Sequence, residues 1–424
     1  EYHVAGYDKT PSPLTDVLES EGIEIHFEDL GAEIPSIYQE VDKTLVVYTP
    51  AVPGDMGELN YFISRGYKVL KRAEVLGLIT RDSKALGVAG THGKTTTSTM
   101  LAHILNESKL GCNAFLGGIS SNFNSNFVSH NMSPWTVVEA DEFDRSFLQL
   151  SPFASIVTST DADHLDIYGD NDEFLDGFRK YINLTNPNGF CVQHTSVEIS
   201  AKNTLTYGLD KDAHYSGLNL RFIDNKFLMD VQAPNEIWEA VELGIPGTHN
   251  AENALACIAM CVKLGLTQSE IRAALKSFLG VKRRFEYHIR TEKLIYIDDY
   301  AHHPTEINAL MDSIGLLYPT KKVIGVFQPH LFSRTRDFFK AFAESLSRLD
   351  ELILLPIYPA REQPIPGITS DSLLESITVK SKHVMTPDEA VSFLSEIEEG
   401  VVLTIGAGNI DRIVPLVKQR LVKG

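Results

Sequence analysis

Short apolar runs alternate with amphipathic stretches along most of the chain, a pattern typical of strands alternating with helices in an α/β protein. Four such runs fall within the first 86 residues, at Tyr2–Gly6, Ile23–Phe27, Thr44–Thr49 and Tyr67–Leu70. They predict a small parallel α/β domain over residues 1–86. The chain opens directly on the first strand, without the preceding strand and glycine-rich turn that normally begin a doubly wound domain. We therefore expect either a truncated sequence or a domain that lacks its first βα unit.

The alternation predicts a second domain over residues 87–281. A strand at Ala85–Ala89 leads into a helix at Thr95–Leu110, and further strands are expected at Trp135–Ala140 and Ala154–Ser159. A more β-like stretch, Gly189–Ile245, precedes an apolar helix over residues 250–264.

A third domain is predicted over residues 282–424, where regular alternation returns. Its expected strands are Leu294–Ile297, Val323–Phe327, Leu352–Pro356 and Val401–Ile405.

The most informative segment is Gly90–Thr95, with the sequence Gly-Thr-His-Gly-Lys-Thr, between a predicted strand and a predicted helix. Glycines let backbone N–H groups approach a polyphosphate, and the helix N-terminus adds partial positive charge. Lys94 would reach the outer phosphates from an accessible loop, and Thr95 could hold Mg²⁺. The full phosphate-loop pattern fails at its first glycine, where Val88 stands. A threonine-capped glycine turn is the alternative, but the arrangement predicts binding of ATP or GTP with magnesium.

Polar residues follow two further strands of the second domain. Glu139, Asp141 and Glu142 come directly after an apolar strand and could hold Mg²⁺, although acidic residues are also common at exposed strand ends. His164 lies among the carboxylates of 161–166 and could bind a second divalent ion, although an isolated loop histidine is more often simply solvated.

Asn250 and Asn253 lie three residues apart at the start of a predicted helix. They share one helix face and could present their amides to a base edge, or they could cap the helix.

Three polar segments follow predicted strands of the third domain: 298–304, Gln328–His330 with Arg334 and Arg336, and 406–409. In an open α/β sheet such strand ends line the crevice where ligands bind. Each segment could be structural by itself, but together they indicate a site.

Composition narrows the class of partner. The net charge of −18 argues against nucleic acid, so an anionic substrate would need local basic clusters such as Lys282–Arg284. No apolar run approaches the ~20 residues that cross a bilayer, and no secretory leader is visible. The four cysteines lack metal-binding spacing, and Cys257 and Cys261 are expected to be core thiols. A reducing cytoplasm is the expected location.

These motifs together resemble the Mur ligases, three-domain ATP-dependent amide-bond ligases of peptidoglycan assembly. The resemblance rests on Gly90–Thr96, Glu139, 163–166, 249–253, 284–286 and Asp299, and runs from about Asp8 to Asp411. Within the family, 299–304 and 327–335 are similar to the branch that joins L-alanine to UDP-N-acetylmuramate. The resemblance implies an α/β fold with a Rossmann-like N-terminal domain, a central P-loop ATPase-like parallel sheet and a Rossmann-like C-terminal domain.

The resemblance also implies roles for matching residues. Gly90, Thr91, His92, Gly93, Lys94, Thr95 and Thr96 would hold the ATP phosphates, with Arg284 on the phosphates, Asp299 on the ribose and Asn250 and Asn253 on adenine. Thr95 and Glu139 would bind one Mg²⁺ and His164 the second. Gly117 and Gly118 would lie near the uridine nucleotide sugar, and His330 and Arg334 would position alanine and the acyl intermediate. Lys94, His164, His330 and Arg334 would be the catalytic residues.

The implied reaction activates a carboxylate as an acyl phosphate, which the alanine amine attacks. Three other functions stay open: a ligase that attaches a preformed murein peptide to the same sugar nucleotide, a phosphotransferase, and a nucleotide-binding regulator without catalysis. We expect a cytoplasmic monomer or homodimer without membrane insertion.

Overall fold

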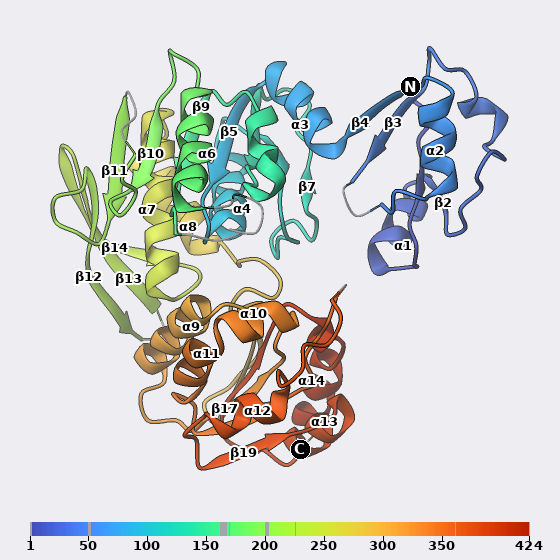
Figure 1. The fold of residues 1–424 in the computed structure, drawn as a ribbon. Coiled ribbons are helices and arrows are strands. Elements are labelled where there is room, and N and C mark those ends of the chain that lie inside the picture. The colour runs from blue at the N-terminus through green and yellow to red at the C-terminus, as the bar shows by residue number, and fades with distance from the viewer. Residues whose placement is uncertain are drawn as a thin grey trace. The chain divides into compact units, whose positions relative to one another are not determined.

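The computed structural model describes residues 2–49, 52–161, 168, 170–199, 203–224, 226–360 and 362–423. The chain divides into two compact units, residues 1–82 and 83–424, which are described separately (Figure 1).

Within residues 2–49 and 52–82, the first unit contains two parallel strand pairs and three α-helices. Strand β1 (Ala5–Tyr7) pairs with β2 (Glu24–His26), and β3 (Leu45–Tyr48) pairs with β4 (Lys68–Lys71). The helices are α1 (Pro13–Ser20), α2 (Gly57–Ser64) and α3 (Arg72–Arg81), with a 3₁₀ turn, η1, at Ser36–Tyr38. Helix α1 begins where the Ser12 hydroxyl accepts a hydrogen bond from the Thr15 N–H. All four predicted strands are present, shifted by a few residues.

A ten-stranded sheet lies in the first half of the second unit, in the order β14-β13-β12-β11-β10-β9-β5-β8-β6-β7. Its strands are β5 (Lys84–Ala89), β6 (Asn113–Phe115), β7 (Phe127–Val128), β8 (Trp135–Glu139), β9 (Ala154–Val157), β10 (Cys191–His194), β11 (Thr204–Gly208), β12 (Tyr215–Ile223), β13 (Lys226–Ala233) and β14 (Glu236–Leu243). Seven neighbouring strands run parallel: β5, β6 and β8–β12. Strands β13 and β14 extend one side of the sheet as an antiparallel ribbon, and β7 is an antiparallel strand at the other edge.

Helices pack on this sheet because its central strands are apolar on both faces. They are α4 (Lys94–Asn106), α6 (Asn171–Asn183), α7 (Thr248–Lys263) and α8 (Gln268–Ser277), with a 3₁₀ segment, η2, at Phe143–Gln149. Helices α4, α7 and α8 contact one another and share a core with β5, β8 and β9. Cys257 and Cys261 are free and fully buried in that core, which confirms the prediction of core thiols.

A six-stranded sheet in the order β15-β16-β20-β17-β18-β19 forms the rest of the second unit. Its strands are β15 (Glu286–Arg290), β16 (Leu294–Asp299), β17 (Val323–Phe327), β18 (Glu351–Leu354), β19 (Ser381–Val384) and β20 (Gly400–Ile405). All neighbours are parallel except β15. The predicted strand Leu294–Ile297 is confirmed as part of β16, but it is the second strand of this domain and not the first. Strand β15 was not predicted, because its sequence Glu-Tyr-His-Ile-Arg is too polar for an apolar-run criterion.

Two separate cores cover the two faces of the six-stranded sheet. Ile295 and Ile297 of β16 face one core, whereas Leu294 and Tyr296 face the other, as the period of two in a strand requires. Helices α9 (Pro304–Leu317), α11 (Phe339–Leu346) and α12 (Ser370–Glu375) supply the first core, and α13 (Pro387–Leu394) and α14 (Val414–Lys423) the second (Figure 1). Two short segments complete the fold, α10 (Phe332–Asp337) and η3 (Asn409–Arg412).

This topology positions the polar strand ends. Strands β16, β20 and β17 are neighbours in the sheet and run parallel, so the segments that follow Asp299, Ile405 and Phe327 leave from one edge. In the ten-stranded sheet β8, β5 and β9 are likewise adjacent, so Glu139, the Gly90 turn and Thr158 lie at one edge. A doubly wound sheet binds ligands at such edges.

Candidate functional site

A cavity of about 880 Å³ in the second unit is lined by strand ends of both of its sheets. The predicted site residues that line it are Thr91, His92, Gly93, Lys94, Thr95, Thr96, Gly117, Gly118, Glu139, Asn250, Asn253, Arg284, Asp299 and Arg334. Gly90 and His330 are not among its lining residues. His164 lies outside the residues that the structure describes.

The turn from Gly90 to Gly93 is held against the end of β9. The N–H groups of Thr91 and His92 donate to the carbonyl and hydroxyl oxygens of Ser159, at 3.2 and 2.9 Å. Gly90 has φ +137°, and a Cβ there would meet the Thr158 hydroxyl. Helix α4 then starts at Lys94, so its first N–H groups lack intrahelical acceptors and face the cavity as an anion site.

The prediction that Lys94 lies in an accessible loop is wrong. Lys94 is the first residue of α4, its side chain is only 13% exposed, and its Nζ donates to both carboxylate oxygens of Glu142 at 2.8 and 2.7 Å. Burial opposes protonation of Lys94, but the carboxylates of Glu142 and Asp141 outweigh it and raise the pKa of Lys94. The sequence identified Glu142 only as a member of an acidic run. The pair with Lys94 was not predictable, because no local pattern connects residues 94 and 142.

Glu139 joins two predicted parts of the site. One carboxylate oxygen accepts from the Thr95 hydroxyl at 3.1 Å, and the other accepts from the Gly117 N–H at 3.1 Å. A Cβ at Gly117 would collide with that carboxylate, so only glycine allows this approach. Burial raises the pKa of Glu139, and Lys94 counters it. A hydroxyl and a carboxylate in contact beside a phosphate loop are the oxygen donors that Mg²⁺ requires, so these residues fit the ion.

Asn250 and Asn253 are buried and largely committed to internal hydrogen bonds. Asn250 Nδ2 donates to the Pro246 carbonyl at 2.6 Å, and Asn253 Oδ1 accepts from the Thr97 hydroxyl at 3.0 Å. A Cβ at Gly93 would lie 2.8 Å from Asn253 Oδ1. Asn253 therefore braces the turn before α4, and the two asparagines keep only part of their amide capacity for a ligand.

Arg284 enters the cavity from the segment that leads into β15. Its guanidinium lies 4.8 Å from the centre of the Tyr300 ring and 3.8 Å from a carboxylate oxygen of Glu306. Both oxygens of Asp299 accept backbone N–H groups, from Phe285 and Ala301, each at 2.8 Å. Burial raises the pKa of Asp299 to about 6 against the opposing effect of Arg284.

His330 and Arg334 follow β17, as predicted, but they occupy different surroundings. Arg334 lines the cavity, and no carboxylate pairs with it in the described part of the chain. The His330 ring stacks on Tyr358 at 5.6 Å, and its buried Nδ1 has no hydrogen-bond partner among the described residues. Burial, with His302 and Arg334 nearby, lowers the pKa of His330 to about 4.

The third polar strand end has a structural role. Gln328 Nε2 donates to Asn409 Oδ1 at 2.8 Å, and Gln328 Oε1 accepts from the Ile410 N–H at 2.9 Å. A Cβ at Gly406 or Gly408 would meet Gln328 atoms, so the glycines of this segment allow the neighbouring strand end to approach closely.

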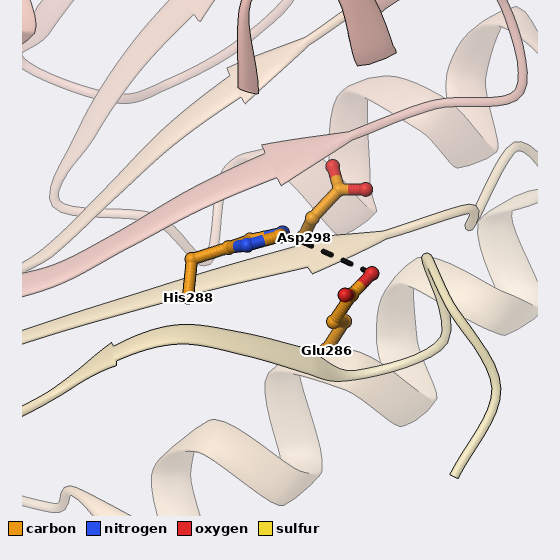
Figure 2. Close-up of side chains that lie close together, drawn as sticks. All are labelled: Glu286, His288 and Asp298. Atoms are coloured by element: carbon orange, nitrogen blue, oxygen red, sulfur yellow. Dashed lines mark ion pairs between the residues drawn. The ribbon is translucent and has the colours of Figure 1, made fainter. Parts of the chain in front are cut away.

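Glu286, His288 and Asp298 form a separate cluster, with one possible metal-ligand atom from each within 4.8 Å of the others (Figure 2). His288 Nε2 lies 3.9 Å from a Glu286 oxygen. However, Arg283 Nε donates to Asp298 Oδ2 at 3.2 Å, and the Arg283 N–H donates to Glu286 at 2.7 Å. Because a guanidinium already balances this charge, we interpret the cluster as an ion-pair network that holds the segment before β15.

Three family models match successive parts of the chain: "Mur ligase family, catalytic domain" over residues 1–84, "Mur ligase middle domain" over 88–261, and "Mur ligase, glutamate ligase domain" over 283–408. A curated UDP-N-acetylmuramate–L-alanine ligase from Cytophaga hutchinsonii is 46% identical over 424 residues, covering 98% of this chain and 91% of the relative.

Solved structures are similar over nearly the whole chain. A UDP-N-acetylmuramate-alanine ligase from Thermotoga maritima has a TM-score of 0.80 and 27% identity, covering 99% of this chain and 92% of the other. A murein peptide ligase from Psychrobacter arcticus has a TM-score of 0.66 and 21% identity, covering 99% and 93%, and shares the fold. These matches confirm the predicted α/β fold class with its three-domain architecture.

Proposed function

The chain belongs to the Mur ligase family, and on that basis we propose that it joins L-alanine to the lactyl carboxylate of UDP-N-acetylmuramate at the expense of ATP. The observation that carries the proposal is one cavity lined both by the first residues of the phosphate-loop helix and by Arg334, which has no carboxylate partner among the described residues. A nucleotide and an amino-acid carboxylate could thus be held together. The identity to curated alanine ligases supports this choice of amino acid.

We assign the ATP phosphates to the 90–96 segment and Arg284. The N-terminal N–H groups of α4 would bind the phosphate oxygens, and Lys94 would turn from Glu142 toward the transferred phosphoryl group. Asp299 would contact the ribose, and Asn250 and Asn253 would offer their remaining amide groups to adenine.

Thr95 and Glu139 would hold one Mg²⁺, and His164 would serve a second. Bound Mg²⁺ would offset negative charge on the phosphoryl group during transfer to the lactyl carboxylate. The residues of this chain supply the rest: Lys94 and the α4 N–H groups orient the phosphates, and Gly117 and Gly118 leave room beside Glu139 for the sugar nucleotide.

Arg334 would bind the alanine carboxylate, because a guanidinium forms a two-pronged pair with a carboxylate. His330 does not line the cavity itself, but its ring is stacked on Tyr358 and lies 6.2 Å from the ring of His302 on the cavity wall. From there it would limit the volume for the amino-acid side chain. The alanine amine would then attack the acyl phosphate, and phosphate would leave.

Several predictions about the whole chain stay predictions: the domain boundaries at residues 86 and 281, a UDP-sugar-binding role for the N-terminal domain, the cytoplasmic location and the monomeric or homodimeric state. Across the described residues, each helix is too short or too polar to span a lipid bilayer.

Measuring ADP release with ATP, Mg²⁺, UDP-N-acetylmuramate and candidate amino acids, alone and together, tests the proposal. We expect steady release only when UDP-N-acetylmuramate and L-alanine are both present, with an amide product of matching mass. ADP release that needs no amino acid would instead support a phosphotransferase, and no release under any condition would support the regulator.

A further inference from the structure

His302 lies on the cavity wall between β16 and α9, oriented by a carboxylate. Its Nδ1 is 3.0 Å from the Tyr300 carbonyl oxygen and 3.3 Å from Glu306 Oε2. Both neighbours are acceptors, provided that Glu306 is ionised, so the ring proton belongs on Nδ1 and the lone pair on Nε2.

Glu306 is held in the ionised form. The backbone N–H groups of His302 and His303 donate to its Oε2 at 2.9 and 3.2 Å. Burial opposes ionisation of Glu306, but His302 and Arg284 outweigh it and lower the pKa of Glu306 to about 2. The carboxylate therefore fixes the tautomer of His302 and stabilises the imidazolium form, as carboxylates do for catalytic histidines.

The Nε2 of His302 is available to a ligand. It has no hydrogen-bond partner among the described residues, and the side chain lines the same cavity as Arg334 and Lys94. The charged and titratable groups that face it are Glu306, Arg334, Arg284 and His330. Burial lowers the pKa of His302; Glu306 opposes this, and Arg334 and Arg284 add to it. The unprotonated imidazole is therefore the resting form at neutral pH.

We propose that His302 Nε2 is the general base that removes the proton from the alanine nitrogen during amide formation, an inference that rests on the proposed function. The nitrogen forms a bond to the acyl-phosphate carbon, and the carbon–oxygen bond to phosphate breaks. One proton of the alanine ammonium group moves to Nε2 before the attack, and the second leaves the nitrogen on the departing phosphate. The imidazolium, paired with Glu306, later releases its proton to water. No other co-reactant is needed.

Other imidazoles in this region are less suited to the role. His330 has no carboxylate on a ring nitrogen among the described residues, and burial with two neighbouring cationic or imidazole groups lowers its pKa to about 4. His303 Nδ1 accepts a hydrogen bond from the Thr305 N–H as the N-cap of α9.

The test separates the two halves of the reaction in His302→Gln. Hydroxylamine is largely unprotonated at neutral pH and traps the acyl phosphate without a base, so hydroxamate formation reports the first half. We expect His302→Gln to form hydroxamate at near the unmutated rate, while its rate with alanine falls by roughly 10²–10⁴-fold. Normal alanine turnover by His302→Gln, or equal loss of both products in the folded variant, would overturn the inference. Absence of hydroxamate with the unmutated protein would instead overturn the proposed function.

The pH profile of kcat/KM for alanine gives a readout that a merely structural role would not move. The acid limb should lie below the usual range of a histidine and disappear in His302→Gln, whose rate should instead rise with pH as free amine accumulates. Glu306→Gln should lower the rate and move the acid limb further down, because the carboxylate that raises the pKa of His302 is lost. His288→Gln, at a partly buried histidine outside the cavity, is the control and should keep the unmutated profile. An acid limb that survives in His302→Gln would contradict the assignment.

Discussion

At the scale of single residues, most charged side chains that line the cavity already have a partner in the unliganded protein. Lys94 is held by Glu142, Arg284 lies near Glu306, and Asp299 is held by two backbone N–H groups. Arg334 is different, since no carboxylate partner is present in the described residues. Substitution of a paired residue should therefore lower both stability and activity, whereas substitution of Arg334 should lower activity alone.

Lys94→Ala should abolish ligation and also destabilise the protein, by roughly 3–5 kcal/mol, because it leaves the buried Glu142 carboxylate unpaired. Burial already raises the pKa of Glu142, and removal of Lys94 should raise it further. The variant should therefore regain stability relative to the unmutated protein as the pH falls and Glu142 binds a proton.

Denaturant unfolding at several pH values measures this effect, with Lys94→Met/Glu142→Gln as the matched control. The double variant should recover much of the stability but none of the activity. Equal stability of Lys94→Ala and the unmutated protein at neutral pH would contradict the buried pair, and normal turnover would contradict the phosphate-loop role.

Arg334→Ala should raise the KM for alanine about ten- to a hundred-fold and leave the KM for ATP nearly unchanged. The loss corresponds to one charge-assisted hydrogen-bonded contact, roughly 1.5–3 kcal/mol. Arg336→Ala is the control, since Arg336 is exposed and pairs with Asp337. Steady-state kinetics with each substrate varied in turn would measure the two KM values. A change in the KM for ATP alone would contradict the assignment.

Asp299 should make the unliganded protein less stable as the pH rises from about 4 to 6. Its pKa is raised from an ordinary value of about 3.9 to about 6 by burial, so the folded state binds the proton more tightly than the unfolded state. The stabilisation is fully present below the ordinary value and is lost as the pH passes the folded value. The stability difference between the unmutated protein and Asp299→Asn should shrink over this interval; a constant difference would show that the pKa is not raised.

At the scale of elements, the turn into α4 depends on glycine at Gly93. Its φ of +80° favours glycine, and a Cβ would lie 2.8 Å from Asn253 Oδ1. Gly93→Ala should therefore cost roughly 1–2 kcal/mol in backbone strain and raise the KM for ATP by displacing the α4 N-terminus.

Gly265→Ala is the matched control for this substitution. Gly265 has φ +87° with nothing within 4 Å of its Cβ position, so it imposes similar strain far from the cavity lining. It should lower stability but leave the kinetics unchanged. An unchanged KM for ATP in Gly93→Ala would show that this turn does not hold the nucleotide.

The apolar pattern predicted the elements that form the two sheet centres, because buried parallel strands are continuous apolar runs. It missed β15, whose polar residues form the Arg283 network, the edge strand β19, and the very short β6 and β7. For the site, local patterns predicted the turn at Gly90–Thr95, and the resemblance implied that Thr95 and Glu139 hold one Mg²⁺. The contact between their side chains is a finding of the structure. Local patterns could not predict the Lys94–Glu142 pair or the Asn253 brace, which depend on contacts between residues 48 and 156 positions apart.

At the scale of the whole molecule, the second unit unites the ten-stranded and six-stranded sheets around one cavity. The residues proposed to bind the nucleotide phosphates lie mainly on the first sheet, whereas Arg334, His302 and Asp299 lie on or beside the second. Under the proposed roles, the reaction would draw on residues from both parts, as a ligase that joins two substrates requires.

The identity of the nucleophile tests the central claim most directly. With ATP, Mg²⁺ and UDP-N-acetylmuramate saturating, L-alanine and the murein tripeptide are offered in competition, and the product is identified by mass. We predict that the sugar nucleotide gains a single alanine residue and that kcat/KM is much higher for alanine than for the tripeptide. A product that carries the tripeptide would contradict alanine addition and identify a peptide ligase instead.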